Sequence, residues 1–174
     1  MIKKIFFGLL AVILILILVA FFLPSRWAVE ESIEIQRSPE TIYPYLANFK
    51  QWENWTVWTK EDYDPSMTYR YQGIEGQVGF QQYWEGKKGK GVLTLNQLTA
   101  NRYVQYHIEM EQCKFDGALE LFPQNGNTKI VWKCFGNNDV NPVSKLIQFI
   151  FKPFIKADFK KGLQKLKTLI EQLP

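Results

Sequence analysis

Residues 103–110 read YVQYHIEM, and this stretch has the cleanest strand pattern in the chain. Successive side chains of a strand point to opposite faces, so Val104, Tyr106, Ile108 and Met110 share one face. The opposite face is mainly polar. This pattern predicts a strand with its apolar face against a core and its polar face toward solvent.

Similar runs rich in aromatic and β-branched residues lie on both sides of this stretch, separated by polar or glycine-bearing turns. A further run, Val29–Ile35, predicts a strand near the start of the domain. Between about residues 67 and 137 we expect a meander of six antiparallel strands: Met67–Gln72, Val78–Trp84, Gly91–Leu98, Tyr103–Met110, Phe115–Phe122 and Thr128–Phe135.

Two short helical segments are expected between the first strand and the meander. Ser38 is a candidate N-cap followed by Pro39 at the first helical position. Pro44 is expected to interrupt this helix, because proline lacks the backbone N–H that a helix interior uses. A second helical turn should then pass through Trp52 and Trp55.

The last part of the chain predicts a long helix. Asn141 and Pro142 open an apolar stripe, and Pro153 is expected to break it. An amphipathic helix of about 19 residues should then run to the C-terminus, with apolar residues at three- and four-residue intervals. The order of elements therefore predicts an α+β fold, in which a curved antiparallel sheet surrounds a long C-terminal helix. The space left between them should be lined by aromatic side chains or occupied by a ligand.

The N-terminus carries an unbroken apolar run over residues 5–23, which as a helix spans roughly 28 Å. We expect a transmembrane helix here, with residues 1–4 in the cytoplasm because Lys3 and Lys4 precede it, and with the soluble domain extracytoplasmic. A cleaved signal peptide and a buried core helix are the alternatives. Residues 24–28 are expected to be a linker, and residues 29–174 one domain.

Four separated motifs resemble the START-like (SRPBCC) superfamily, in particular its polyketide cyclase/dehydrase-like group. They are the strand and S-P-E helix start over residues 33–46, the W-x-x-W-x-x-W segment from Trp52 to Trp58, the W-E-G hairpin beginning at Trp84, and the strand and closing helix over residues 127–132 and 158–171. The resemblance implies a helix-grip fold with a hydrophobic cavity. It does not decide function, because this fold serves both carriers and enzymes.

No catalytic or metal-binding constellation stands out. His107 is predicted on the polar face of its strand, and the two cysteines, Cys113 and Cys134, suit either a disulfide or two independent thiols. The glycine- and lysine-rich segment 86–91 is better explained as a hairpin turn than as a phosphate-binding loop. The net charge of +4 is scattered along the chain, which gives no support for nucleic-acid binding.

The aromatic residues are the strongest functional signal, since rings supply apolar area and Tyr and Trp add a polar tip. The hypothesis is a membrane-anchored protein that binds a hydrophobic small molecule or lipid in the helix-grip cavity, without a cofactor. A cyclase- or hydrolase-type enzyme acting on an apolar substrate, and a filled-core scaffold that contacts envelope proteins, are the alternatives. The candidate ligand-binding residues are Trp55, Trp58, Tyr69, Tyr71, Phe80, Trp84, Tyr106, Trp132, Phe154 and Phe159.

Overall fold

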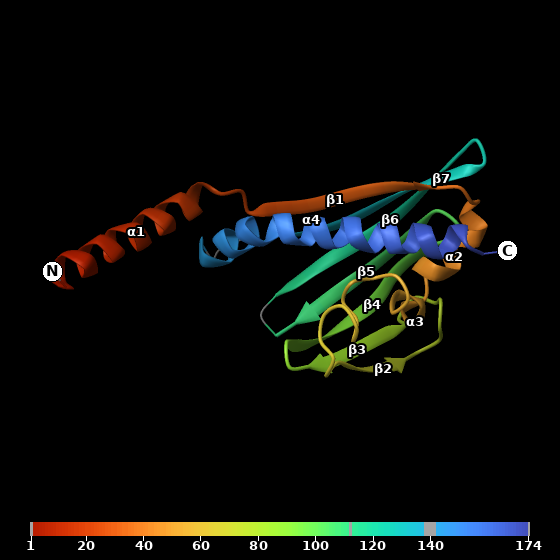
Figure 1. Ribbon diagram of the computed structural model, residues 1–174, viewed down its shortest axis with the longest axis horizontal. Coiled ribbons are helices and arrows are strands. Elements are labelled where there is room, and N and C mark those ends of the chain that lie inside the picture. The colour runs from red at the N-terminus through yellow and green to blue at the C-terminus, as the bar shows by residue number, and fades with distance from the viewer. Residues whose placement is uncertain (1, 112, 138–141, 174) are drawn as a thin grey trace.

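The computed structural model describes residues 2–111, 113–137 and 142–173, and its centre is one antiparallel sheet of seven strands. The strand order across the sheet is β1-β7-β6-β5-β4-β3-β2, so the first strand pairs with the last. The sheet curves around the C-terminal half of a long helix, α4 (Figure 1). The strands are β1 (Arg26–Ile35), β2 (Thr68–Gln72), β3 (Gln81–Gly86), β4 (Gly89–Thr99), β5 (Tyr103–Met110), β6 (Lys114–Gln124) and β7 (Asn127–Asn137). This arrangement confirms the expected α+β, helix-grip fold.

The strand predictions are confirmed in number and order, but several bounds differ. The strand expected from Val78 begins only at Gln81. Gly79 has a φ of +87°, a left-handed conformation that an extended strand does not use, and Val78 is exposed. The expected linker over residues 24–28 is also shorter, since β1 begins at Arg26.

Two short helices, α2 (Pro39–Leu46) and α3 (Phe49–Trp52), lie at one end of the sheet (Figure 1). Ser38 is the N-cap residue and Pro39 the first helical residue, as expected. The predicted interruption at Pro44 is wrong, because α2 continues to Leu46. In such a short helix Pro44 removes one internal hydrogen bond, and the burial of Ile42 and Leu46 holds the last turn.

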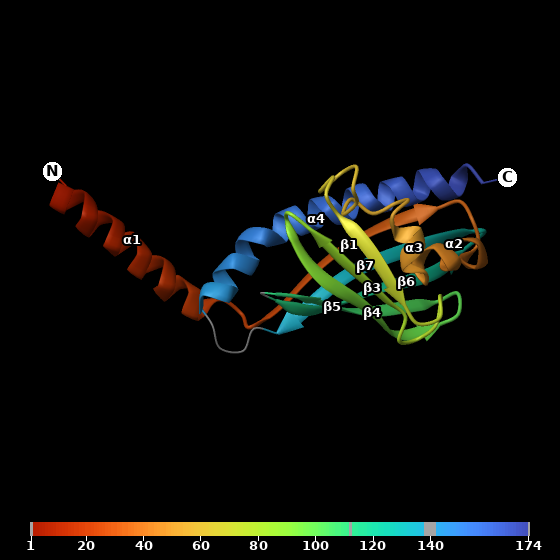
Figure 2. The same cartoon turned by 90° about the horizontal axis from the view of Figure 1, so that it is seen from below.

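The long helix α4 (Pro142–Glu171) is continuous through Pro153, so the predicted break is also wrong. The helix bends, so that its N-terminal part turns away from the sheet (Figure 2), and an internal proline is a common cause of such a bend. Only the C-terminal part of α4 packs into the sheet, through Phe159, Leu163, Leu166 and Ile170. Asn141, expected to open this region, lies outside the described residues.

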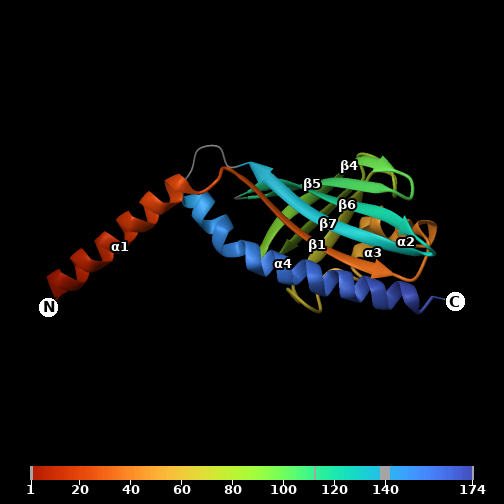
Figure 3. The same cartoon turned by 90° about the horizontal axis from the view of Figure 1, so that it is seen from above.

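The N-terminal apolar run forms a single helix, α1 (Ile2–Phe22), which projects away from the sheet (Figure 3). Its contact with the rest of the protein is with α4, where Lys145 Nζ donates a hydrogen bond to the Leu23 carbonyl oxygen at 3.1 Å. Within the described residues, no helix has the length and hydropathy of a membrane-spanning segment.

Candidate functional site

An aromatic cluster fills the space between the sheet and the C-terminal half of α4. Its centre is Trp132 of β7, which stacks on Phe159 of α4 with ring centroids 4.0 Å apart and planes within 4°. Trp52 and Trp55 pack edgewise on Trp132, at 6.0 and 5.1 Å. All four side chains are buried, so they form a core rather than the wall of an open cavity.

One buried hydrogen bond fixes the cluster to the middle of the sheet. Trp132 Nε1 donates to the Tyr106 hydroxyl oxygen at 2.6 Å. The Tyr106 ring lies flat over Gly117 of β6, where an added Cβ would come within 2.1 Å of the ring. Burial raises the pKa of Tyr106 well above its ordinary value, so its phenol stays protonated at neutral pH.

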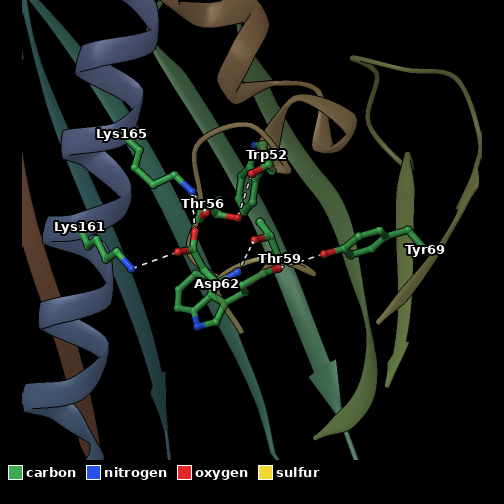
Figure 4. Close-up of polar contacts among 8 residues, drawn as sticks. Trp52, Thr56, Thr59, Asp62, Tyr69, Lys161 and Lys165 are labelled. Carbon is green, nitrogen blue, oxygen red and sulfur yellow. Dashed lines mark hydrogen bonds and ion pairs between the residues drawn. The ribbon is translucent and has the colours of Figure 1, made fainter. Parts of the chain in front are cut away.

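The loop between α3 and β2 closes this cluster from above and is tied down on both sides (Figure 4). On the helix side, Asp62 accepts hydrogen bonds from Lys165 Nζ at 2.6 Å and from Lys161 Nζ at 3.2 Å. On the sheet side, the Tyr69 hydroxyl donates to the Trp58 carbonyl oxygen at 3.1 Å. These contacts hold the W-x-x-W-x-x-W segment against the core.

Beyond the cluster, the concave face is less completely filled toward the β3–β4 and β5–β6 hairpins. We call this region the open end and define it by five partly buried apolar side chains that pack on the core, namely Trp58, Trp84, Ile108, Phe115 and Ile155. They come from the α3–β2 loop, from the three strands β3, β5 and β6, and from α4, so they lie on both the sheet side and the helix side of the grip. Figure 1 shows that these hairpins lie on the same side of the domain as α1.

Two polar side chains lie near the open end, the Asp158 carboxylate and the Trp27 indole N–H. The Asp158 carboxylate is half-buried beside Trp58, whose side chain hydrogen-bonds to it, and burial raises the pKa of this carboxyl. Trp27 packs edgewise on Phe115, with ring centroids 5.5 Å apart. Among the buried side-chain polar atoms of the described residues, Trp27 Nε1 alone has no hydrogen-bond partner. A buried donor without a partner is costly, and a ligand oxygen is one group that would satisfy it.

The structure divides the ten candidate ligand-binding residues into three sets. Trp55, Phe80, Tyr106, Trp132 and Phe159 are buried in the core, whereas Trp58, Tyr69, Tyr71 and Trp84 are partly buried along the concave face. Phe154 is 63% exposed and lies apart from both sets. Whether any of the ten contacts a ligand remains a prediction.

Two residues of the cluster were not among the candidates. Phe49 stacks on Phe80 at 5.8 Å and Trp52 meets Tyr106 edgewise at 4.9 Å, so both belong to the same aromatic core. The three-residue spacing of Trp52, Trp55 and Trp58 in the sequence could have indicated that Trp52 belongs with the other two. The pairing of Asp62 with two lysines of α4 had no signal in the local sequence, because the residues lie about a hundred positions apart.

The tyrosines along the concave face act as hydrogen-bond donors. Tyr71 donates to the Glu53 carboxylate, and burial together with this carboxylate raises the pKa of its phenol. Burial raises the pKa of Tyr69 to about 12. Phenols with such values remain protonated at neutral pH and do not act as bases.

The remaining reactive side chains are His107 and the two cysteines, of which Cys134 is buried in the core. His107 is on the outer face, as predicted, where its Nδ1 lies 2.8 Å from an Asp116 carboxylate oxygen. Cys113 and Cys134 are both free thiols in this structure, and burial raises the pKa of Cys134 to about 12. The glycine- and lysine-rich segment is the β3–β4 hairpin, as expected.

A shallow surface depression of about 540 Å³ crosses strands β2 to β5. Its lining includes Arg70, Tyr83 and Glu109, which alternate with the core-facing residues of their strands and therefore belong to the outer face. The lining also includes Tyr69, Trp84 and Met110, which lie on the other face of these strands, so the depression is not confined to the outer face. The open cavity expected between sheet and helix is instead occupied largely by the protein's own aromatic rings.

Comparison with known proteins places this fold in a wide group. Residues 26–171 match the family described as polyketide cyclase / dehydrase and lipid transport. A search of curated proteins gave no significant match.

Many solved structures share the fold at low sequence identity. Protein MLL2253 from Mesorhizobium loti is similar with a TM-score of 0.63 and 13% identity, over 85% of this chain and 99% of that one. The Aha1 dimer from Colwellia psychrerythraea is similar with a TM-score of 0.60 and 17% identity, over 84% and 97% of the two chains. Identities this low support the fold alone.

Proposed function

Because this chain belongs to the polyketide cyclase / dehydrase and lipid transport family, we propose that it binds a hydrophobic small molecule or a lipid at the open end of the grip. The observation that carries the proposal is the set of partly buried apolar side chains there, Trp58, Trp84, Ile108, Phe115 and Ile155. Covering such surface is favourable by about 25 cal/mol per Å². The filled cluster behind them would form the floor of the site.

The polar groups near the open end suit recognition rather than catalysis. The unpaired Trp27 indole N–H is a donor for a ligand oxygen, and the half-buried Asp158 carboxylate is an acceptor for a ligand hydroxyl. Tyr69 is already engaged with the Trp58 carbonyl oxygen. We therefore propose orientation of one polar group of the ligand, with no chemical step.

We further propose that α1 attaches the protein to a membrane, where apolar ligands partition. The support is the apolar run itself and the exposure of side chains such as Phe6, Leu14 and Phe21. Lys3 and Lys4 favour an N-terminus in the cytoplasm and a domain outside it.

The test is to purify the full chain in detergent from its host, extract it with organic solvent and identify the apolar molecules by mass spectrometry. The expected result is one species near equimolar with the protein. Trp84→Ala should lower its occupancy roughly tenfold, because losing the burial of a large ring costs at least about 1.5 kcal/mol. Phe122→Ala, at an exposed aromatic residue of β6, is the matched control and should retain the ligand.

A filled-core scaffold is the second candidate, and the stacked Trp132–Phe159 core favours it. An empty protein that also fails to take up hydrophobic fluorescent probes would contradict ligand binding and support the scaffold.

A further inference from the structure

The N-terminal half of α4 carries an apolar face that the fold does not use. Ile147, Ile150, Phe151 and Phe154 are all exposed, although each is a large apolar residue. Their spacing of three and four residues places them along one face of the helix. Of the neighbouring apolar residues, Ile155 packs on the hydrophobic core, whereas Phe149, on the opposite side of the helix from this face, is also exposed.

In the C-terminal half of α4, the same face of the helix is polar instead of apolar. Fourteen residues, or about four turns of 3.6 residues, separate equivalent positions along the helix. Going forward by that spacing from Ile147, Ile150, Phe151 and Phe154 leads to Lys161, Gln164, Lys165 and Thr168. The outer face of α4 is therefore polar wherever it lies over the sheet and apolar only where it extends beyond it.

This apolar face is continuous with α1. The two helices contact each other, and the hydrogen bond from Lys145 to the Leu23 carbonyl oxygen ties the start of α4 to the end of α1. The views from two sides agree that α1 and the first turns of α4 meet at one corner of the domain (Figures 2 and 3). Whatever environment accepts the exposed side chains of α1 is thus adjacent to this half of α4.

The lysines of this region lie on the opposite side of the helix. At 100° per residue, Lys145, Lys152 and Lys156 are about 170° from the centre of the apolar face. Lys145 donates to the Leu23 carbonyl oxygen, and Lys156 pairs with Glu31 at 3.4 Å. A helix with one apolar face and a basic face opposite to it is typical of helices that lie in the interface of an anionic bilayer.

We propose that the face formed by Ile147, Ile150, Phe151 and Phe154 lies in the interface of an anionic phospholipid bilayer. This inference rests on the proposed attachment through α1 and adds a second contact, which fixes the orientation of the domain. Because the open end lies on the same side as α1, this contact holds that end of the grip toward the lipid (Figure 1). A ligand would then pass between bilayer and protein without crossing bulk water.

The experiment uses the full chain in vesicles of phosphatidylcholine and phosphatidylglycerol, with Cys113→Ser to remove the exposed native thiol. An environment-sensitive fluorophore is attached in one protein at Phe154→Cys and in a matched control at Thr168→Cys, which lies on the same helix face fourteen residues later. Lipids carrying a spin-label quencher report the proximity of each label to the bilayer.

We expect loss of fluorescence at position 154 and none at position 168. Quenching at 154 should weaken in vesicles of phosphatidylcholine alone, and unchanged quenching there would overturn the role of the lysines. Equal quenching at both positions, or at neither, would overturn the proposed contact.

Three further readouts separate the alternatives. Failure of the full chain to float with the vesicles would overturn attachment through α1 and this inference with it. Cross-linking between position-154 cysteines of two chains without lipid quenching would assign the face to a second copy and overturn it too. Ligand binding is measured separately, by solvent extraction and mass spectrometry. A protein that binds no ligand but is quenched at position 154 would contradict the proposed function and leave the lipid contact intact.

Discussion

The two halves of α4 are built from similar residues and have opposite surroundings. Phe159 is 2% exposed and stacks on Trp132, whereas Phe154, five residues earlier in the same helix, is 63% exposed. The difference shows that apolar residues in this chain serve two purposes. Those of the C-terminal half pack against the sheet, and those of the N-terminal half are exposed and form the face that we propose to contact lipid.

The largest expected effect comes from truncating these two phenylalanines. Phe159→Ala should lower the free energy of unfolding by about 3–5 kcal/mol, because it leaves a cavity beneath Trp132. Phe154→Ala should change it by less than about 0.5 kcal/mol. Chemical denaturation of the full chain in detergent measures both, and equal losses would break the comparison by showing that Phe154 also supports the fold.

A smaller loss in the free energy of unfolding is expected from Tyr106→Phe, which tests how much one hydrogen bond contributes to the buried half. The substitution keeps the ring over Gly117 but removes the acceptor of the Trp132 Nε1 hydrogen bond. Leaving that buried donor unpaired should cost about 1–3 kcal/mol. Tyr103→Phe, at a partly exposed position of the same strand, is the control for loss of a hydroxyl. An unchanged unfolding midpoint would show that water or movement of Trp132 replaces the bond.

The smallest effect concerns the outer face of the C-terminal half. Asp62→Asn should cost about 0.5–1 kcal/mol, as expected for partly exposed ion pairs with Lys161 and Lys165. These lysines lower the pKa of Asp62 below its ordinary value of 3.8. The folded protein therefore favours the ionised carboxylate, so this stabilisation is complete above the ordinary pKa and is lost as the pH falls through the lowered one.

The difference in unfolding free energy between Asp62→Asn and the native protein should accordingly disappear at low pH. Glu61→Gln is the neighbouring control. A difference that persists in acid would assign the effect to packing of the loop instead of charge.

The fold was largely predictable because its signals are local. The bounds of β5 match the alternating stretch 103–110, and the order of elements follows from the sequence of strand and helix patterns. Proline was the misleading signal, since Pro44 and Pro153 both lie inside helices. At Pro44 the burial of Ile42 and Leu46 outweighs the loss of one backbone hydrogen bond, whereas in α4 a single proline can bend a long helix without ending it.

The candidate site was predictable in composition but not in burial. Aromatic residues were correctly identified along the concave face, yet the sequence does not state which rings fill the core and which remain accessible. The placement of Phe154 did have a signal, because residues five apart on a helix point about 140° away from each other. Phe154 and Phe159 could not both have faced the sheet once the helix continued through Pro153.

The pairing of β1 with β7 has a consequence for how the protein is made. Val29 pairs with Cys134, and the sheet encloses the C-terminal half of α4, which ends at Glu171. During synthesis, the apolar face of β1 therefore stays uncovered until β7 and α4 have been made, which is near the end of translation. Long-range pairing of this kind slows folding and prolongs the exposure of aggregation-prone strands. This protein should depend on holding chaperones until its final helix has left the ribosome.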